Sequence, residues 1–209
     1  MASAVVKIGH QLLRLQPVYD FYQNLVGGVS YRTSIVENLV KLGKPVYLDL
    51  GCGTATIAKR LNSSTRYIGI DNSDNYLKKA REVFPQHQFF NKDLGKKSWN
   101  ESLETMGSTV ATGLGLLHHL DDKSAMSFLE SCRSILEKES LLFTVDPVIV
   151  KDTSRVARWF AENDRGKFIR NPDQLEKMFQ QVGFTVEVAV RKKQFRIPLD
   201  TVEILAKPE

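Results

Sequence analysis

Two segments near the start of the chain carry apolar residues at helical spacing. In residues 16–26 these side chains recur at positions i, i+3, i+4 and i+7, with Pro17 at a helix-starting position. They are Val18, Phe21, Tyr22 and Leu25. The second segment starts at Ser30, which is expected to cap it, and ends at Gly43. The pattern therefore predicts two helices ahead of the first strand.

Short apolar runs then alternate with further helical patterns. The runs that predict strands are 46–50, 67–71, 87–91, 110–117 and 141–145. Helices are expected after Ser73, weakly over 99–106, over 125–136 behind an Asp121 or Asp122 cap, and from Asn171 to Gly183. This alternation favours an open, mostly parallel sheet with helices on both faces. The closing runs 184–190 and 201–205 have no room for a helix between them, so we expect them to be antiparallel.

The first strand ends abruptly in Leu50-Gly51-Cys52-Gly53-Thr54. Gly51 and Gly53 lack a Cβ where the loop must turn, so a ligand can approach the backbone near the positive end of a helix. That helix is expected to run through Ile57, Ala58 and Leu61. Such a turn suits either a nicotinamide or flavin dinucleotide or S-adenosylmethionine (SAM).

Two positions around the turn, Thr56 and Asp49, separate these two cofactors, whereas the ribose that Asp71 would hold is common to both. Asp71 ends the second strand, about 20 residues after the glycines, where a carboxylate accepts hydrogen bonds from an adenosine ribose. A pyrophosphate turn calls for a third glycine, but Thr56 stands there. Asp49, just before the glycines, suits the cationic sulfonium and amino-acid end of SAM. The pattern favours SAM, although Asp71 is also a candidate helix cap and Asp49 a candidate structural acid.

Composition indicates one ordinary intracellular domain. The chain has 209 residues, 42% of them hydrophobic, and a net charge of +5 that is scattered along the sequence. Neither Cys52 nor Cys132 has neighbours that would form a metal site, so no metal is expected. No segment has the length and apolarity of a signal peptide core or a membrane span. We therefore expect a cytoplasmic location.

Four motifs in order resemble those of the class I SAM-dependent methyltransferases, in particular the small-molecule and natural-product enzymes. They are Leu48-Asp49-Leu50-Gly51-Cys52-Gly53-Thr54, Gly69-Ile70-Asp71, Asp93-Leu94 and Gly115-Leu116-Leu117-His118-His119-Leu120-Asp121-Asp122. The resemblance implies a Rossmann-like α/β fold whose seven-stranded, mostly parallel sheet has an antiparallel last strand. It implies one domain over 1–209, with an N-terminal helical lid at 1–44 and an acceptor-side insertion at 151–171.

The resemblance also implies roles for individual residues. The glycines lie beneath the methionine part of SAM, Asp71 holds the ribose, Asp93 and Leu94 border the adenine, and Leu114 lies under the sulfonium. Tyr22 is similar to a lid tyrosine near the cofactor, although aromatic residues at helical spacing are also typical of a core. The expected cofactor-binding residues are Tyr22, Asp49, Gly51, Gly53, Asp71, Asn72, Asp93, Leu94 and Leu114.

Two histidines follow the fourth predicted strand at the cofactor edge. His118 or His119 is a candidate general base, because a histidine near neutral pKa accepts a proton from a hydroxyl or ammonium. A structural role in shaping the loop is the alternative for both, and His118 is the stronger catalytic candidate. The loop lacks the Asn/Asp-Pro-Pro-aromatic pattern of enzymes that methylate base amines, and neither cysteine fits the cytosine-carbon enzymes. A small-molecule acceptor is expected rather than a nucleic acid.

The segment 158–170 mixes aromatic and charged residues and is the expected acceptor side. Trp159 and Phe168 are candidates to sandwich a ring, and Arg165 or Arg170 to hold an acidic group. A solvated lid surface explains the same residues. Two further functions stay open: a fold relative that binds SAM without methyl transfer, as a regulatory partner or cyclase, and an NAD-dependent oxidoreductase.

Overall fold

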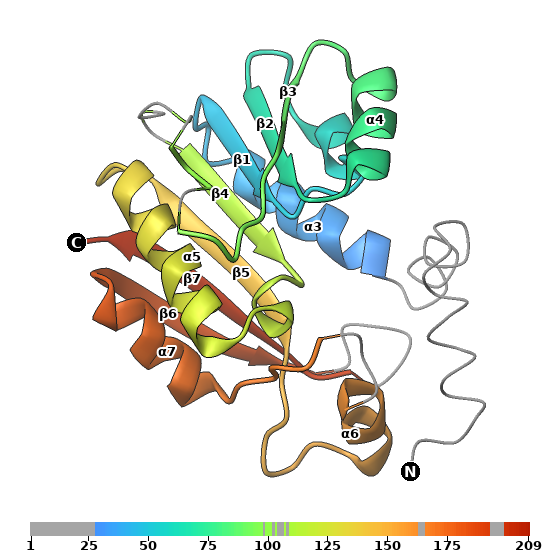
Figure 1. Ribbon diagram of the computed structural model, residues 1–209. Helices are drawn as coiled ribbons and strands as arrows, with labels where there is room; N and C mark the ends of the chain where they lie inside the picture. The colour runs from blue at the N-terminus through green and yellow to red at the C-terminus, as the bar shows by residue number, and fades with distance from the viewer. Residues whose placement is uncertain are drawn as a thin grey trace.

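The computed structural model describes residues 28–97, 99–101, 103, 107, 109–162, 166–192 and 199–209. Their strands form one sheet in the order β3-β2-β1-β4-β5-β7-β6 (Figure 1). The strands are β1 (Val46–Leu50), β2 (Arg66–Asp71), β3 (Gln88–Asn91), β4 (Thr109–Leu114), β5 (Leu141–Pro147), β6 (Phe184–Arg191) and β7 (Thr201–Pro208). The helices are α3 (Gly28–Val40), η1 (Thr56–Arg60), α4 (Asp74–Val83), η2 (Leu117–His119), α5 (Asp122–Ile135), α6 (Arg155–Glu162) and α7 (Pro172–Gln181).

The sheet has the predicted mixture of strand directions. β1 pairs in parallel with β2 and β4, β2 with β3, and β4 with β5. β7 is antiparallel to both of its neighbours, β5 and β6. The carboxyl ends of the parallel strands therefore meet at one edge, which is where open α/β sheets bind ligands. The fold class expected from the sequence is confirmed.

The alternation of side chains along β1 divides the interior into two cores. Leu48 and Leu50 pack in the core that contains the α5 and α7 stripes, whereas Tyr47 lies in the core with α3 and α4. Figure 1 shows α5 and α7 on one face of the sheet and α3 on the other. The predicted apolar stripe of α5 is buried, with Phe128 and Leu129 both 0% exposed. Helices thus cover both faces, as expected for a mostly parallel sheet.

Three local expectations differ from the structure. The helix expected after the glycine turn is only the five-residue 3₁₀ helix η1, because Ala55 is left-handed (φ 57) and Leu61 is already extended. α3 begins at Gly28, so Ser30 lies within the helix rather than capping it. Within the described residues of 99–106 there is no helix. The helix predicted over 16–26 lies outside the described residues, and the lid and insertion boundaries stay predictions.

The connection from β5 to α7 leaves the sheet before it returns. Figure 1 shows α6 off the end of the sheet, beyond the carboxyl end of β5. α7 then starts with a complete capping box: the Asn171 side chain accepts from the backbone N–H of Gln174, and the Gln174 side chain accepts from the backbone N–H of Asn171. Among the described helices, none is long and apolar enough to cross a membrane.

Candidate active site

The glycine turn is tied to the end of β2. Gly51 and Gly53 have positive φ values of 80° and 54°, which a glycine adopts without steric cost. The backbone N–H groups of Gly51 and Cys52 both donate to the carbonyl of Ile70, at 2.8 and 2.9 Å. The N–H of Gly53 donates to Oδ2 of Asp71 at 2.8 Å. The turn and the acidic residue expected to hold a ribose are therefore one rigid unit.

The carboxylate of Asp71 has hydrogen-bond acceptor positions that the protein does not use. Its Oδ1 accepts from the backbone N–H of Ser73 at 2.9 Å, so each oxygen carries one backbone hydrogen bond. A carboxylate offers about four acceptor positions, which leaves two for the hydroxyls of a ribose. Ser73 itself caps α4, since its side chain accepts from Tyr76 N. Asn72 is exposed beside this carboxylate.

Asp49 lies beneath the turn and is only 4% exposed. The hydroxyl of Tyr67 donates to its Oδ2 at 2.6 Å, and the hydroxyl of Thr112 to its Oδ1 at 3.4 Å. Burial raises the pKa of Asp49 to about 6, against the lowering effect of the Tyr67 hydrogen bond and of the Arg32 charge. Asp49 thus joins β1 to both neighbouring strands, which is the structural role considered for it as an alternative. Its part in cofactor binding stays a prediction.

Arg32 lies at the same edge of the sheet and is a candidate site residue that the sequence reasoning missed. Its Nη2 lies 3.5 Å from the carbonyl oxygen of Leu114, at the end of β4. It also lies 3.5 Å from where a Cβ on Gly115 would be. A guanidinium at the carboxyl ends of the strands is suited to hold a carboxylate. Nothing in the local pattern of α3 distinguishes this arginine from a solvated one, so only the packing of α3 reveals it.

The segment after β3 comes close to Asp71. The N–H of Lys92 donates to the backbone carbonyl of Asp71 at 3.0 Å. Asp93 is exposed and accepts from the N–H of Gly95 at 3.0 Å, and Leu94 is buried in the core with α5. The structure therefore brings Asp93 and Leu94 to the same edge as the glycine turn, while Leu94 also serves the core.

The two histidines have different environments. His118 is 5% exposed, and its Nδ1 lies 2.7 Å from Oδ1 of Asp146, the residue before the last position of β5. The same oxygen accepts the backbone N–H of His118 at 3.0 Å. His119 is exposed, with its ring centroid 4.1 Å from that of His118. A carboxylate can only accept, so a neutral His118 ring that bonds to Asp146 carries its proton on Nδ1.

Asp146 was not predicted from the sequence. In a sequence, an aspartate before a proline is typical of the start of a turn. Asp146 is also 28 positions away from His118, so no local pattern links the two residues. Its Oδ2 is buried and has no hydrogen-bond partner among the described residues. The ring of His118 also reaches the cofactor edge, because its Cε1 is 3.7 Å from the Cβ position of Gly115.

The segment 166–170 lies across the histidine loop. A Cβ on Gly166 would be 1.8 Å from Cδ2 of His118, so the backbone touches the ring. The N–H of Phe168 donates to the carbonyl of His118 at 3.0 Å. The Phe168 side chain is 40% exposed. This expected acceptor segment and the histidine loop are therefore directly connected.

Arg170 is buried, at 6% exposed, and its donors point into the protein. Nη1 donates to the carbonyls of Leu117 (2.8 Å) and Phe168 (3.2 Å), and Nη2 to that of Leu120 (2.7 Å). Nε donates to Oδ1 of Asp122 at 2.9 Å. The guanidinium thus braces the loop, and the expected contact with an acidic acceptor stays a prediction.

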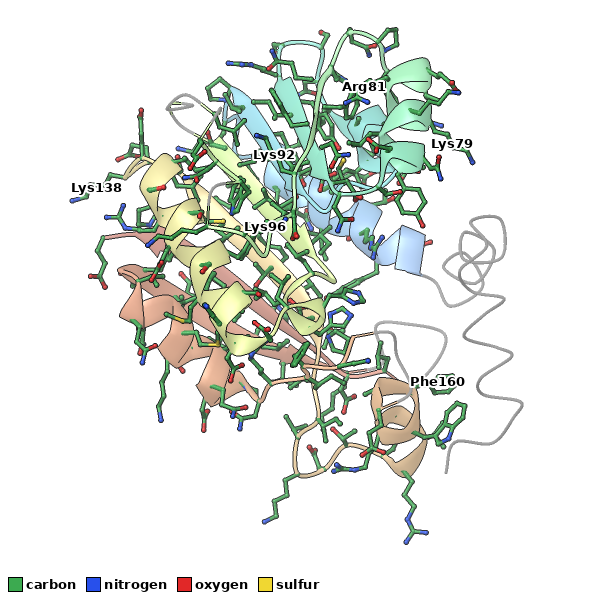
Figure 2. All side chains as sticks on the ribbon, in the orientation of Figure 1. Lys79, Arg81, Lys92, Lys96, Lys138 and Phe160 are labelled. Atoms are coloured by element: carbon green, nitrogen blue, oxygen red, sulfur yellow. The ribbon has the colours of Figure 1, made fainter. Side chains whose placement is uncertain are left out.

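The remaining predicted residues are less defined. Trp159 is 51% exposed on α6 and packs edge-on against Phe160, with centroids 5.1 Å apart. Figure 2 shows Phe160 extending from α6. Tyr22 and Arg165 lie outside the described residues. Among the part of the chain that the structure describes, no group of His, Cys, Asp and Glu side chains could hold a metal ion.

Comparisons with known proteins match part of the sequence to a family and the structure to a known fold. Residues 48–139 match a family described as "Methyltransferase domain". No curated protein sequence matches the chain.

Three solved structures illustrate the fold. The plantazolicin methyltransferase BamL, in complex with a triazolic desmethylPZN analog and SAH, has TM-score 0.70 and 13% identity over 96% of this chain and 94% of that one. A SAM-dependent methyltransferase from Archaeoglobus fulgidus has TM-score 0.68 and 16% identity over 90% and 99%. The [4+2]-cyclase SpnF has TM-score 0.64 and 13% identity over 82% and 81%. At these identities the likeness concerns the fold.

Proposed function

We propose that this chain, whose residues 48–139 match a methyltransferase domain and whose fold is the class I, Rossmann-like one, transfers the methyl group of SAM to an oxygen or nitrogen of a small metabolite. The observation that carries the proposal is the His118–Asp146 pair, a base held in one tautomer beside the cofactor edge. An acceptor that must lose a proton needs such a base, whereas one that is already a free nucleophile does not.

The residues of this chain would hold the cofactor by its two ends. Asp71 has free acceptor positions for the ribose hydroxyls, and no described atom lies within 4 Å of the Cβ position of Gly53. Arg32 offers a cation for the carboxylate of the amino-acid end. Bound SAM supplies a methyl group on a positively charged sulfur, so positioning of the acceptor provides much of the catalysis.

His118 then acts on the acceptor itself. Its Nε2 lone pair accepts the proton as the O–H or N–H bond of the acceptor breaks. Asp146 stabilises the imidazolium that forms, through the hydrogen bond at Nδ1. The 166–170 segment limits water at the ring, because Gly166 lies against it.

Two further observations support a small acceptor and a cytoplasmic location. The basic residues labelled in Figure 2 are spread over α4 (Lys79, Arg81), the segment after β3 (Lys92, Lys96) and the loop before β5 (Lys138). Such scattering does not favour a nucleic-acid backbone. Both cysteines are free and buried, as suits a reducing compartment.

The reaction is tested by release of S-adenosylhomocysteine from SAM with a panel of phenols, catechols, aliphatic alcohols and amines. Acceptor-dependent release is the expected result. The fold by itself leaves a SAM-binding protein without methyl transfer open, since a [4+2]-cyclase shares it. Thermal protection by SAM, with no release for any acceptor, would favour that alternative. Protection by NAD in place of SAM would favour an oxidoreductase.

A further inference from the structure

The two edges of the sheet are unlike each other. The edge strand β3 has four residues, whereas the opposite edge strand β6 has eight and contains no proline. β7 pairs with one side of β6, and within the described part of the chain no strand pairs with its other side. A long edge strand presents a row of free backbone N–H and C=O groups that another strand can pair with, and proteins usually shorten or block such edges.

The side chains of β6 separate by face. Val186 and Val188 pack against the core that includes α7, and the residues that alternate with them along the strand point to the other face. That second face carries Glu187, Ala189 and Arg191. Glu187 is exposed and makes no ion pair or hydrogen bond to any described residue, since the structure gives it none. Arg191 is half exposed, and its Nε donates to Oε2 of Glu203 at 2.8 Å.

We propose that β6 pairs antiparallel with the β6 of a second copy of this chain, centred on Ala189. A two-fold axis at this residue places Glu187 opposite the partner's Arg191, and Arg191 opposite the partner's Glu187. Val188 then faces the partner's Val190 on the other face. The small side chain at Ala189 lets the two strands approach at the axis. The two sheets become one continuous sheet.

Charge selects this register over its neighbours. An axis at Glu187 would oppose two carboxylates, and an axis at Arg191 would oppose two guanidinium groups. An axis at Val188 would place Glu187 opposite an alanine and leave its charge without a partner. An axis placed between two residues would oppose side chains that point to different faces of the sheet, and the pleat of the strands excludes that pairing. The dimer does not depend on the proposed reaction.

Site-specific cross-linking tests the register directly in the full chain. Cys52 and Cys132 are buried. Among the described residues, a cysteine introduced on β6 is therefore the only one with an exposed thiol. Ala189→Cys is expected to form a covalent dimer on mild oxidation, because opposed residues have Cβ atoms about 4.5–5.5 Å apart. Thr185→Cys is the matched control, since its thiol would lie far from its own copy. Equal cross-linking of both variants, or of neither, would overturn the proposal.

Charge reversal provides the second test, by sedimentation equilibrium at micromolar concentration. Wild type is expected to dimerise, and Glu187→Arg to weaken the dimer by about tenfold, or 1.4 kcal/mol. A mixture of Glu187→Arg with Arg191→Glu is expected to associate again, because both opposed pairs are then complementary. Glu82→Arg, an equal charge change on α4, is expected to leave the dimer unchanged. A monomeric wild type, or a dimer insensitive to Glu187→Arg, contradicts the model of pairing through β6.

Discussion

Nδ1 of His118 lies 2.7 Å from Oδ1 of Asp146, and the same oxygen accepts the backbone N–H of His118. One carboxylate oxygen therefore fixes both the ring and the chain that carries it. This arrangement ties the loop after β4 to the end of β5, so the orientation of the candidate base is set by the sheet itself.

Removing the imidazole should abolish most of the turnover. We expect His118→Ala to lower kcat by about 10²–10⁴, the usual contribution of a general base, with little change in SAM affinity. His119→Ala is the control and should stay within a few-fold of wild type. Asp146→Asn should also lower kcat, and imidazole ¹⁵N shifts should show that the Nδ1–H tautomer of His118 is lost. Turnover near wild type in His118→Ala would make this residue a structural part of the loop.

Arg170 should contribute more to stability than to acceptor binding. Arg170→Ala leaves the carbonyls of Leu117 and Leu120 without their donors, so we expect a loss of about 2–4 kcal/mol in the free energy of unfolding. Urea denaturation measures this loss. Lys167→Ala, an exposed neighbour, should have no effect. A large rise in the acceptor KM at unchanged stability would instead support the acceptor contact expected from the sequence.

Gly166 should not tolerate a side chain. In Gly166→Ala the new Cβ would overlap the His118 ring, so the ring or the segment must move. We expect a loss of about 1–3 kcal/mol in stability together with lower turnover. Gly113→Ala is a matched control, because its Cβ would meet Thr144 at an ordinary 3.5 Å. Equal stability of the two variants would show that 166–170 does not rest on the ring in solution.

Asp71 should be needed for cofactor affinity. Asp71→Ala removes the ribose contacts and the hydrogen bonds from Gly53 and Ser73, so calorimetry should show SAM binding weakened by about 10-fold or more, as loss of about 1.4 kcal/mol or more implies. The same change should cost about 1–3 kcal/mol of stability. Glu82→Ala on α4 serves as control for both measurements. Unchanged SAM affinity would remove Asp71 from the cofactor site.

Asp49 should make stability depend on pH in an unusual direction. Its pKa is raised by burial from 3.8 to about 6, so the folded state holds the proton more tightly than the unfolded state. The stabilising contribution of Asp49 to the free energy of unfolding is therefore full below pH 3.8 and is lost as the pH rises through about 6. The rise in pKa from 3.8 to about 6, at about 1.36 kcal/mol per pH unit, corresponds to a loss of about 3 kcal/mol in the free energy of unfolding.

Asp49→Asn isolates this effect. The amide keeps an acceptor for Tyr67 but carries no charge, so we expect the difference in unfolding free energy between variant and wild type to shift in favour of the variant between pH 4 and pH 7. Denaturation at a series of pH values measures the difference, and other carboxylates cancel in it. A difference that does not change with pH would mean that Asp49 titrates equally in both states.

The mostly parallel sheet and the glycine turn at the end of β1 could be predicted from the sequence. The period of the apolar residues reports directly which backbone geometry buries them, as in the α5 stripe and the strands around it. Gly51, Gly53 and Asp71 could be found because a strand, its turn and the next strand end are local in the chain. The prediction of a regular helix after the turn was wrong, because the left-handed Ala55 and the extended Leu61 limit this segment to the short 3₁₀ helix η1.

The contacts of Asp146, Arg32 and Arg170 could not be found in this way. Asp146 meets His118 only because β5 lies beside β4, and Arg32 meets Leu114 across 82 positions because α3 packs behind β1. Arg170 reads as an exposed substrate ligand until the loop carbonyls that surround it are in place. The sequence by itself determined most of the elements and the glycine turn, since both depend on short-range periodicity and backbone freedom. Only the tertiary structure decided which side chains meet, because such contacts depend on strand order and long-range packing.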